Sequence, residues 1–410
     1  MAMAVRASGA DPRPSGLTLP EPLDAEVAAA VLGLDTWFDS MRMPGGYGGP
    51  VVHWWNDCLE YTGPGLDWRY EGLIIGYLNL CDATGDARWL EKAKRAGDDL
   101  VHGQLPNGNY RNSCFELNPN TGGTPHEAAC DLALLRLAMA LRAVGDSRWE
   151  IYAQAAERNL SAFYVARLWD EAARSFRDDP LVPSFVPNKS ATLAEALLAM
   201  TALTGDERWA VRYALPTLDA VIEHQVRGGV LEGAIYQNSF GARRGAAGRG
   251  ATGRVAKFFP YYIARCVPGL LAGYALSHEA RYAEAARQAA QFVARTRYPE
   301  GSFPQVIYPG AKVNRYPQWI AGAGDIARAL GLARQAGVEF DEVTTLSWLL
   351  QGRRADGGFY TAQGFGRATP GGRRDDPRDA LSVCGWADKA FRYFTGRVRP
   401  ETLAATRAQA

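Results

Sequence analysis

Two patterns of hydrophobic and polar positions alternate along this chain, and each is long enough for a helix. One pattern is apolar on nearly every side, as in WRYEGLIIGYLNL (68–80) and ATLAEALLAMTAL (191–203). The other is apolar on one face only, as in ARWLEKAKRAGDDLV (87–101) and RYAEAARQAAQFVARTR (281–297). The first pattern predicts helices that are buried all round, and the second predicts helices that are buried on one side.

A short phrase recurs where the two kinds of helix meet. GDARW at 85–89 returns as GDSRW at 145–149 and GDERW at 205–209, and in degraded form as SHEARY at 277–282. Gly85 suits the left-handed residue that follows a helix, and Asp86 suits the N-cap of the next helix. Trp89 then lies on the first turn, where its ring can lock the two helices together. The phrase therefore predicts repeated helical hairpins.

The number of helices predicts a closed ring. The repeats supply six inner helices but five outer ones, and the opening segment LDAEVAAAVLGLDTWFDSM (23–41) supplies the sixth outer helix. That helix would lie beside the last inner helix, at 379–394, and close the ring. We therefore expect an all-α fold, an (α/α)6 barrel of six inner and six outer helices in one domain over 23–397. Residues 1–22 and 398–410 are expected to be flexible ends.

The connections between helices differ in length. Inner-to-outer connections are tight, whereas outer-to-inner connections run to twenty residues or more and hold most of the Gly, Pro, Asn and aromatic residues. Each long connection carries a phrase close to Gly-x-aromatic, such as NGNYRNS, GAIYQNS or GGFYTAQGFG, which indicates a short extended segment. Long loops in a compact domain are usually functional. The barrel mouth where they gather is the predicted site.

Composition excludes several classes of partner. The 45 basic and 44 acidic residues give a net charge of +1, which disfavours binding to nucleic acid or to an anionic membrane. The apolar runs are too short to span a bilayer, and the N-terminus lacks the apolar stretch of a secretory signal. The six cysteines form no C-x-x-C pair, so we expect reduced thiols in a cytoplasmic protein. The oligomeric state stays open.

The hairpin phrases resemble those of a known superfamily. The hairpins carry Thr-Gly-Asp, then any one residue, then a basic residue and an aromatic one. Together with loops such as QLPNGNY and QGRRADGGFY, this phrase resembles the six-hairpin glycosidase superfamily of (α/α) toroids. The chain is also similar to the toroid of terpenoid cyclases and protein prenyltransferases. The resemblance covers about residues 23–397 and implies a funnel-shaped cavity, with acids at the N-termini of the inner helices or in the loops above. Because one scaffold can host many chemistries, the resemblance does not identify the reaction that the protein would catalyse.

The first long loop (46–72) is the strongest functional signal. It is dense in aromatic and acidic residues, which can stack on sugar rings and act as general acid, general base or nucleophile. Asp57 is assigned a catalytic role, whereas Asp67 could be catalytic or could cap the helix that begins at Trp68. The catalytic candidates in this loop are Asp57, Asp67 and Glu71, and the substrate-binding candidates are His53, Trp54, Trp55, Asn56, Trp68 and Arg69.

The second long loop leads into the next inner helix. In TPHE (124–127), Glu127 fits a capping box, but the same position can set a carboxylate at the lumen edge. Asp131 is one turn deeper in an apolar helix, where an acid is costly without a partner such as Lys189 or Arg111. Glu127 and Asp131 are therefore also catalytic candidates. Arg111 and Arg69 could also bind a substrate carboxylate. The substrate-binding candidates here are Tyr110, Arg111, Asn112 and His126, and the later loops add Lys189, Tyr236, Asn238, Tyr262, Trp319 and Phe359.

Missing motifs narrow the function. The chain has no D-x-D-D phrase, which weakens a class II terpene cyclase, and no His follows Cys384 and Asp379, which disfavours a prenyltransferase zinc site. Only His53 and His126 fall in mouth positions, which disfavours an epimerase similar to N-acylglucosamine epimerase. We expect a carbohydrate-active enzyme without metal or cofactor, a glycoside hydrolase rather than a lyase or epimerase, acting on an oligosaccharide or glycoconjugate. An isoprenoid cyclase or transferase is the alternative, and a non-catalytic binding scaffold is the third reading.

Overall fold

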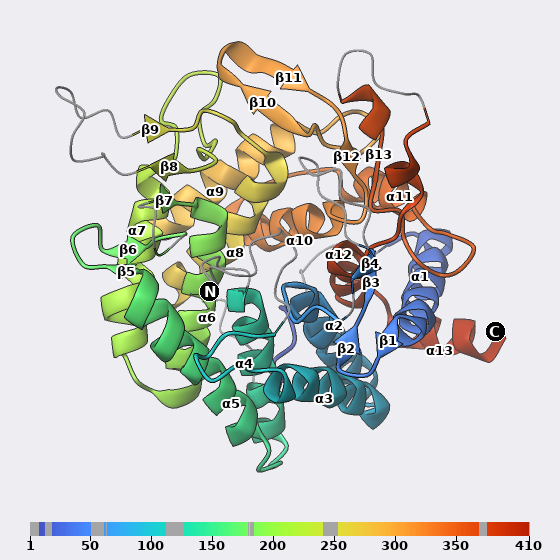
Figure 1. The fold of residues 1–410 in the computed structure, drawn as a ribbon. Helices are drawn as coiled ribbons and strands as arrows, with labels where there is room; N and C mark the ends of the chain where they lie inside the picture. The colour runs from blue at the N-terminus through green and yellow to red at the C-terminus, as the bar shows by residue number, and fades with distance from the viewer. Residues whose placement is uncertain are drawn as a thin grey trace.

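The helices form two concentric layers around one axis, as predicted (Figure 1). The structure is a computed structural model that describes residues 8–12, 19–50, 61–62, 64–111, 127–178, 180, 184–240, 253–368 and 375–409. Within this part of the chain, the inner helices are α2 (Arg69–Thr84), α4 (Glu127–Ala143), α6 (Pro187–Thr204), α8 (Pro260–Ser277), α10 (Ala323–Ala333) and α12 (Cys384–Thr395). Each packs against the next, and α12 packs against α2, so the inner ring is closed.

The outer layer contains the amphipathic helices. They are α1 (Glu21–Ser40), α3 (Ala87–His102), α5 (Trp149–Arg158) with its π-helical continuation η1 (Asn159–Leu168), π-helical η2 (Trp209–Ala214) with α7 (Leu215–Glu223), α9 (Ala280–Arg295) and α11 (Glu342–Leu350). In α3 the buried residues include Trp89, Ala93, Ala96 and Leu100, which follow the three-to-four spacing of one helix face. As predicted from 23–41, α1 supplies the sixth outer helix and packs against α12.

The repeated phrase adopts the predicted turn. Gly85 has φ 68°, in the left-handed region, and its N–H donates to the carbonyl of Cys81 at 2.8 Å. The Asp86 side chain accepts from the backbone N–H of Arg88 at 3.1 Å and caps α3. The Trp89 ring is buried, with the Arg88 guanidinium 4.0 Å from its centre. Local sequence chemistry is therefore sufficient to turn the chain from an inner helix to an outer one.

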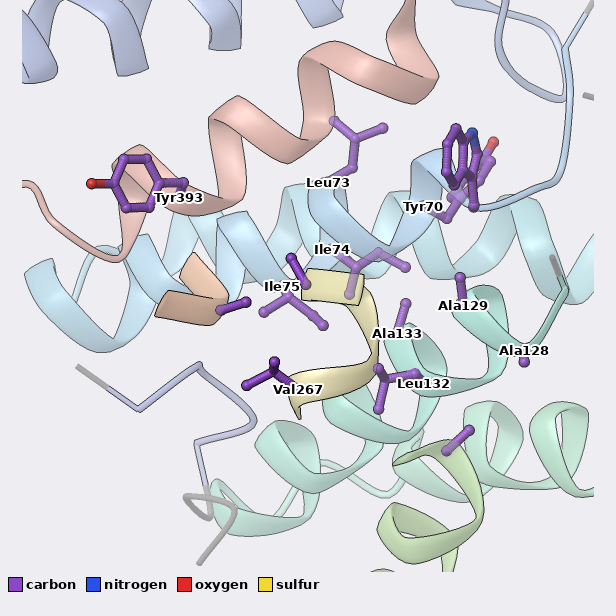
Figure 2. Close-up of a cluster of buried hydrophobic side chains, with 14 of the residues drawn as sticks. Tyr70, Leu73, Ile74, Ile75, Ala128, Ala129, Leu132, Ala133, Val267 and Tyr393 are labelled. Atoms are coloured by element: carbon purple, nitrogen blue, oxygen red, sulfur yellow. The ribbon is translucent and has the colours of Figure 1, made fainter. Parts of the chain in front are cut away.

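The core lies between the layers and between neighbouring inner helices. Figure 2 shows one part of it, with Ile74 and Ile75 of α2 and Leu132 and Ala133 of the neighbouring helix α4. All four side chains are fully buried. Inner helices that are apolar on most sides are thus covered on both flanks by their neighbours in the ring.

The long connections carry short antiparallel strands, as the extended phrases predicted. The strands are β1 (Arg42–Met43) with β2 (Gly46–Tyr47), β3 (Gly49–Pro50) with β4 (Tyr61–Thr62), β5 (Trp169–Asp170) with β6 (Ser175–Phe176), β7 (Ser184–Phe185) with β8 (Ser239–Phe240) and β9 (Gly253–Arg254), β10 (Val306–Tyr308) with β11 (Lys312–Asn314), and β12 (Gln318–Trp319) with β13 (Ala362–Gln363). Each strand follows an outer helix and precedes an inner one, so the strands gather at the mouth, where the inner helices begin. Single-turn 3-10 helices complete these connections at η3 (Pro309–Ala311), η5 (Phe365–Arg367) and η6 (Pro377–Ala380), and η4 (Arg334–Ala336) extends α10.

Both chain ends differ from the flexible segments expected. After α12 the chain forms a further helix, α13 (Pro400–Gln409), which packs against α1 and buries Leu403. Arg399 donates to the Asp24 carboxylate of α1 at 2.7 Å and holds the start of this helix. Near the N-terminus, Gly9, Ala10 and Asp11 are buried. The sequence alone did not reveal these contacts, because their partners are hundreds of residues away.

The close approach of α6 and α8 gives a first prediction. A Cβ at Gly269 of α8 would lie 2.5 Å from the backbone carbonyl oxygen of Ala191 in α6. We expect Gly269→Ala to lower the free energy of unfolding by about 1–3 kcal/mol, since overpacking outweighs the roughly 1 kcal/mol that Ala gains in helix propensity. Urea unfolding measures the change. In the control Gly253→Ala the new Cβ would lie 4.0 Å from its nearest neighbour, and equal stability losses in both variants would contradict the packing argument.

Candidate active site at the barrel mouth

The barrel lumen is filled with charged side chains that pair across it. Glu71 of α2 accepts from both terminal nitrogens of Arg265 in α8, at 3.1 and 2.8 Å. Because α2 and α8 are three places apart in a ring of six inner helices, this bidentate pair spans the lumen. Arg392 of α12 also donates to Glu71, and Arg265 donates to Asp325 of α10 at 3.1 Å. The lumen is therefore polar and highly charged.

A second layer of charges lies deeper, and the N-terminal segment contributes to it. Asp11 binds Arg392 through both carboxylate oxygens, at 2.6 and 2.7 Å, and lies 3.5 Å from Arg328 of α10. Its backbone N–H donates to the Asn79 side chain at 2.8 Å. Residues 8–12 precede α1, which starts at the end of the barrel opposite the mouth, so this segment enters the lumen from the far end.

The lumen environment drives the pKa values of two carboxyls apart. Burial by itself would raise the pKa of Glu71, but Arg265 and Arg392 overcome this effect and hold that pKa well below its usual range. Burial raises the pKa of Asp388 to about 7, with Lys389 opposing the rise and Asp325 and Glu71 adding to it. Asp388 therefore exchanges a proton near neutral pH while Glu71 stays ionised.

Asp388 is held in place through one of its two oxygens. Its Oδ2 accepts from Lys389 Nζ at 2.5 Å and from the Gly72 backbone N–H at 3.1 Å. Its Oδ1 has no hydrogen-bond partner among the described residues. An unoccupied oxygen on a carboxyl of raised pKa is where a transferable proton would sit.

Aromatic rings cover the lumen at the mouth. Trp386, in the first turn of α12, stacks on Trp319 of β12 with ring centres 4.3 Å apart and planes at 14°. It meets the edge of Trp68 at 4.7 Å and lies 5.1 Å from Tyr261. Tyr262 lies 5.8 Å from Tyr261 at the start of α8. We call these five residues the aromatic layer.

The aromatic layer forms hydrogen bonds and a cation–π contact with the charged side chains below it. The Tyr261 hydroxyl donates to Asp325 at 3.2 Å. Lys389 Nζ lies 4.7 Å from the Trp68 ring centre and donates to the Trp68 carbonyl at 3.0 Å. A ligand that stacked on these rings would therefore lie close to ionisable groups of known orientation.

The structure brings only some of the predicted residues into this arrangement. Trp68, Tyr262 and Trp319 belong to the aromatic layer, and Glu71 belongs to the charged lumen. Asp67 accepts from the Arg69 backbone N–H at 3.2 Å and from its guanidinium at 2.7 and 2.9 Å, so the two residues bind each other at the start of α2. Arg69 is 2% exposed and donates also to the Tyr47 carbonyl, which leaves it no position from which to bind a substrate carboxylate.

The remaining predicted residues lie in other surroundings. Asp131 is buried and accepts from the Tyr110 hydroxyl at 2.7 Å, while Lys189 pairs with Asp178 at 3.1 Å. Arg111 is exposed, and Phe359 is fully buried against Phe394. Tyr236 and Asn238 are half-buried beside β8.

Several predicted residues lie outside the described part. His53, Trp54, Trp55, Asn56, Asp57, Asn112 and His126 fall in the undescribed segments, and of Glu127 only the backbone, which starts α4, is described. The roles assigned to these residues stay predictions.

Sequence reasoning missed most of the lumen charges. They lie on inner helices whose surroundings are otherwise apolar, and they are Arg136, Glu195, Arg265, Asp325, Arg328, Asp388, Lys389 and Arg392. The argument that singled out Asp131, that an acid within an apolar helix needs a partner, applies equally to each of them. Trp386 of the aromatic layer carried no comparable signal in the sequence.

A further cavity lies outside the ring of inner helices. It has a volume of about 560 Å³ and is lined by β5–β8 and α7. His224 on its wall has both ring nitrogens engaged, with Ala220 O at 2.7 Å and Ser239 Oγ at 2.8 Å, and burial lowers its pKa. We place the candidate site at the mouth because there the carboxyls of Glu71, Asp325 and Asp388 lie beneath the aromatic layer.

Some further features of the described residues bear on function. No described helix has both the length and the hydropathy needed to cross a bilayer. Cys81, Cys130, Cys266 and Cys384 form no disulfide within the described part of the chain. No group of three or more His, Cys, Asp or Glu side chains in the described ranges is arranged to hold a metal ion.

Comparison with known proteins identifies the fold. No protein-family model and no curated protein sequence matches the chain. Among solved structures, unsaturated glucuronyl hydrolase from Bacillus sp. GL1 is similar, with TM-score 0.57 and 16% identity over 90% of this chain and 94% of that one. Cellobiose 2-epimerase from Bacillus thermoamylovorans B4167 has TM-score 0.63 and 12% identity over 91% and 99%.

A third similar structure is a complex. It is an inactive variant of an α-1,6-mannanase from Salegentibacter sp. HEL1_6 bound to α-1,6-mannotetrose, with TM-score 0.59 and 12% identity over 91% of this chain and 98% of that one. At these identities the likeness shows the fold alone. The chain has the fold of the six-hairpin glycosidase-like (α/α)6 toroids.

Proposed function

We propose that this protein is a glycoside hydrolase that binds an oligosaccharide or glycoconjugate at the barrel mouth. The observation that carries the proposal is the character of the lumen, where Glu71, Asp325 and Asp388 lie with their cationic partners beneath the aromatic layer. Sugar sites need polar groups for hydroxyls and aromatic faces for ring C–H groups, whereas isoprenoid sites need deep apolar walls. The charged lumen favours the sugar.

The chemistry requires carboxyl groups in two protonation states. Cleavage of a glycosidic bond needs a protonated acid that gives its proton to the leaving oxygen, and an ionised carboxylate that activates water or attacks the sugar carbon. Asp388, with a pKa of about 7, meets the first requirement, and we assign it the role of proton donor. Asp325, bound by Tyr261 and Arg265, is the second carboxylate that we assign. Asp57, Glu127 and Asp131 stay further candidates.

Access to Asp388 requires the aromatic layer to move. Asp388 is fully buried, two residues after Trp386 and beside the Lys389 side chain that contacts Trp68. The proposal therefore includes displacement of Trp386 or Trp68 when a sugar binds. Glu71 is not assigned a catalytic role, because Arg265 and Arg392 occupy both of its oxygens.

The test is an activity screen with two panels. We expect hydrolysis of at least one oligosaccharide, measured as new reducing ends, and no turnover of isoprenoid diphosphates. Conversion of a free sugar to its epimer or isomer without hydrolysis would replace the hydrolase by an epimerase or isomerase. Turnover of an isoprenoid diphosphate alone would contradict the proposal.

A further inference from the structure

A serine and a histidine form a hydrogen-bonded pair on the wall of the cavity outside the ring of inner helices. His224 Nε2 and Ser239 Oγ are 2.8 Å apart, and Nδ1 of the same ring lies 2.7 Å from the Ala220 carbonyl oxygen. Both residues belong to the lining of this cavity, whose volume of about 560 Å³ is typical of a small-molecule site. None of the five residues of the aromatic layer lines it, so the pair is separate from the candidate site at the mouth.

The surrounding fold fixes the direction of both hydrogen bonds. His224 follows the last residue of α7, and Ala220 lies in the last turn of that helix, so the ring binds a carbonyl at the helix end. A carbonyl oxygen only accepts, so Nδ1 carries the proton of the ring. Burial lowers the pKa of His224, with the Ala220 bond opposing this change and Arg254 adding to it, so the ring is neutral near pH 7. Nε2 therefore accepts, and the Ser239 hydroxyl donates to it.

This arrangement has the parts of an activated nucleophile. Such sites place a hydroxyl within hydrogen-bond reach of a general base, and a third group orients the base. Here Ser239 supplies the hydroxyl, His224 is the base, and the Ala220 carbonyl orients the ring. The backbone of Ser239 pairs with Phe185 of β7 on one side and with Arg254 of β9 on the other, and the Phe185 ring lies 4.8 Å from the imidazole. The pair is therefore held on rigid elements.

We propose that this cavity is a second active site, in which Ser239 and His224 hydrolyse a short-chain carboxylic ester. Ser239 is the nucleophile and His224 is the general base. The activity is additional to the glycoside hydrolysis proposed for the mouth and does not depend on it.

The lining of the cavity suits such an ester. Phe176 and Phe185 form apolar wall for the acyl chain, and Arg174 and Arg177 bring positive charge into the lining. Arg177 is held by Asp170 at 2.6 Å, and Arg174 is exposed. Positive charge in the cavity stabilises the negative charge that develops on the carbonyl oxygen when a serine attacks an ester.

The reaction proceeds in two stages. Ser239 Oγ attacks the carbonyl carbon of the ester while its proton moves to His224 Nε2, and the bond from that carbon to the alcohol oxygen then breaks as the alcohol leaves with the proton. Water next attacks the acylated serine and gives a proton to Nε2. The carboxylic acid departs as that proton returns to Ser239 Oγ. Ester and water thus become acid and alcohol, and no other reactant is needed.

The first test labels the parent protein covalently and needs no variant. Phenylmethylsulfonyl fluoride reacts with an activated serine, whose Oγ displaces fluoride from sulfur, and peptide mass spectrometry locates the sulfonyl group. We expect it on Ser239. Ser175 and Ser184 line the same cavity, but both nitrogens of His224 are already engaged, so these two serines are internal controls that should stay unlabelled.

The second test measures turnover of 4-nitrophenyl acetate, with the reaction in the absence of protein subtracted. Ser239→Ala should abolish ester hydrolysis, and His224→Gln should lower it by about 10²-fold or more, the usual contribution of a general base. The control Ser277→Ala removes a hydroxyl that donates to the Gly273 carbonyl at 2.8 Å at the end of α8, and it should leave ester hydrolysis unchanged. Melting temperatures show whether each variant is folded.

Labelling of the parent protein decides the matter even if a variant does not fold. Absence of the sulfonyl group from Ser239, equal labelling of Ser175 and Ser184, or ester hydrolysis in folded Ser239→Ala equal to that of the parent would overturn the second active site. If the bond between Ser239 and His224 were only structural, both variants would melt at lower temperature and the parent would not be labelled at Ser239. Neither test involves a glycoside, so a negative result leaves the proposed function at the mouth to its own test.

Discussion

Asp388→Asn is expected to lower kcat/KM by roughly 10²- to 10⁴-fold, which is the usual contribution of a general acid. Asn keeps the size of the side chain and an oxygen for Lys389, but it has no proton to transfer. The measurement is turnover of the oligosaccharide found in the activity screen. The control is Asp356→Asn, which removes an exposed aspartate paired with Arg354 on the surface and should leave turnover unchanged. Equal activity of the two variants would remove Asp388 from the mechanism.

The pH dependence gives this prediction a second readout. Because the acid form is the active one and the Asp388 pKa is about 7, the parent enzyme should lose kcat/KM as pH rises above about 7. The folding stability of the parent enzyme should also depend on pH. A carboxyl whose folded pKa lies above its unfolded value of 3.8 destabilises the fold progressively as pH rises from about 4 to about 7. Asp388→Asn should lack that decline, and a decline equal to the parent's would show that another group titrates.

Asp11→Ala is expected to lower the free energy of unfolding by about 3–5 kcal/mol, the cost of removing one partner from a buried ion pair. The change removes the carboxylate that binds Nε and Nη2 of Arg392 and lies beside Arg328, so that Arg392 keeps only Glu71 as an anionic partner. Urea unfolding measures it. The control is Glu284→Gln, which breaks an exposed pair with Arg287 and should cost no more than about 1 kcal/mol. If Asp11→Ala also lowered the free energy of unfolding by no more than about 1 kcal/mol, the N-terminal segment would not be part of the folded core.

Asp11 affects the pH dependence of folding stability in the opposite direction to Asp388. Burial would raise its pKa, but Arg392 and Arg328 overcome this and hold it well below its usual value of 3.8. A depressed carboxyl pKa contributes stability that is fully present above the unfolded pKa and is lost as pH falls below it. The difference in stability between parent and Asp11→Ala should therefore be constant near neutral pH and shrink below about pH 4.

The pattern of apolar positions was enough to predict the barrel, because helix periodicity and turn chemistry are local. Gly85 and Asp86 act within one or two residues of themselves, and each hairpin repeats the same solution. The closing of the ring by α1 followed from the number of helices. The site was predictable only to the level of the mouth, where the long loops gather. Trp68, Tyr262 and Trp319 were expected at that mouth and lie in the aromatic layer, and their role in substrate binding stays a prediction.

The roles of individual charges could not be predicted from sequence, because a charge takes its role from partners brought close by the ring. Glu71 is like any rim acid in the sequence, yet Arg265, 194 positions away, holds it in an ion pair. Asp388 has an ordinary position on an inner helix, and only its burial beside Lys389 and near Asp325 raises its pKa. The sequence by itself determined the helices, their order and the mouth, since those depend on neighbours along the chain. Tertiary structure alone decided which carboxyl carries a proton and that residue 11 enters the lumen, since electrostatic energy depends on distance in space and on exclusion of water.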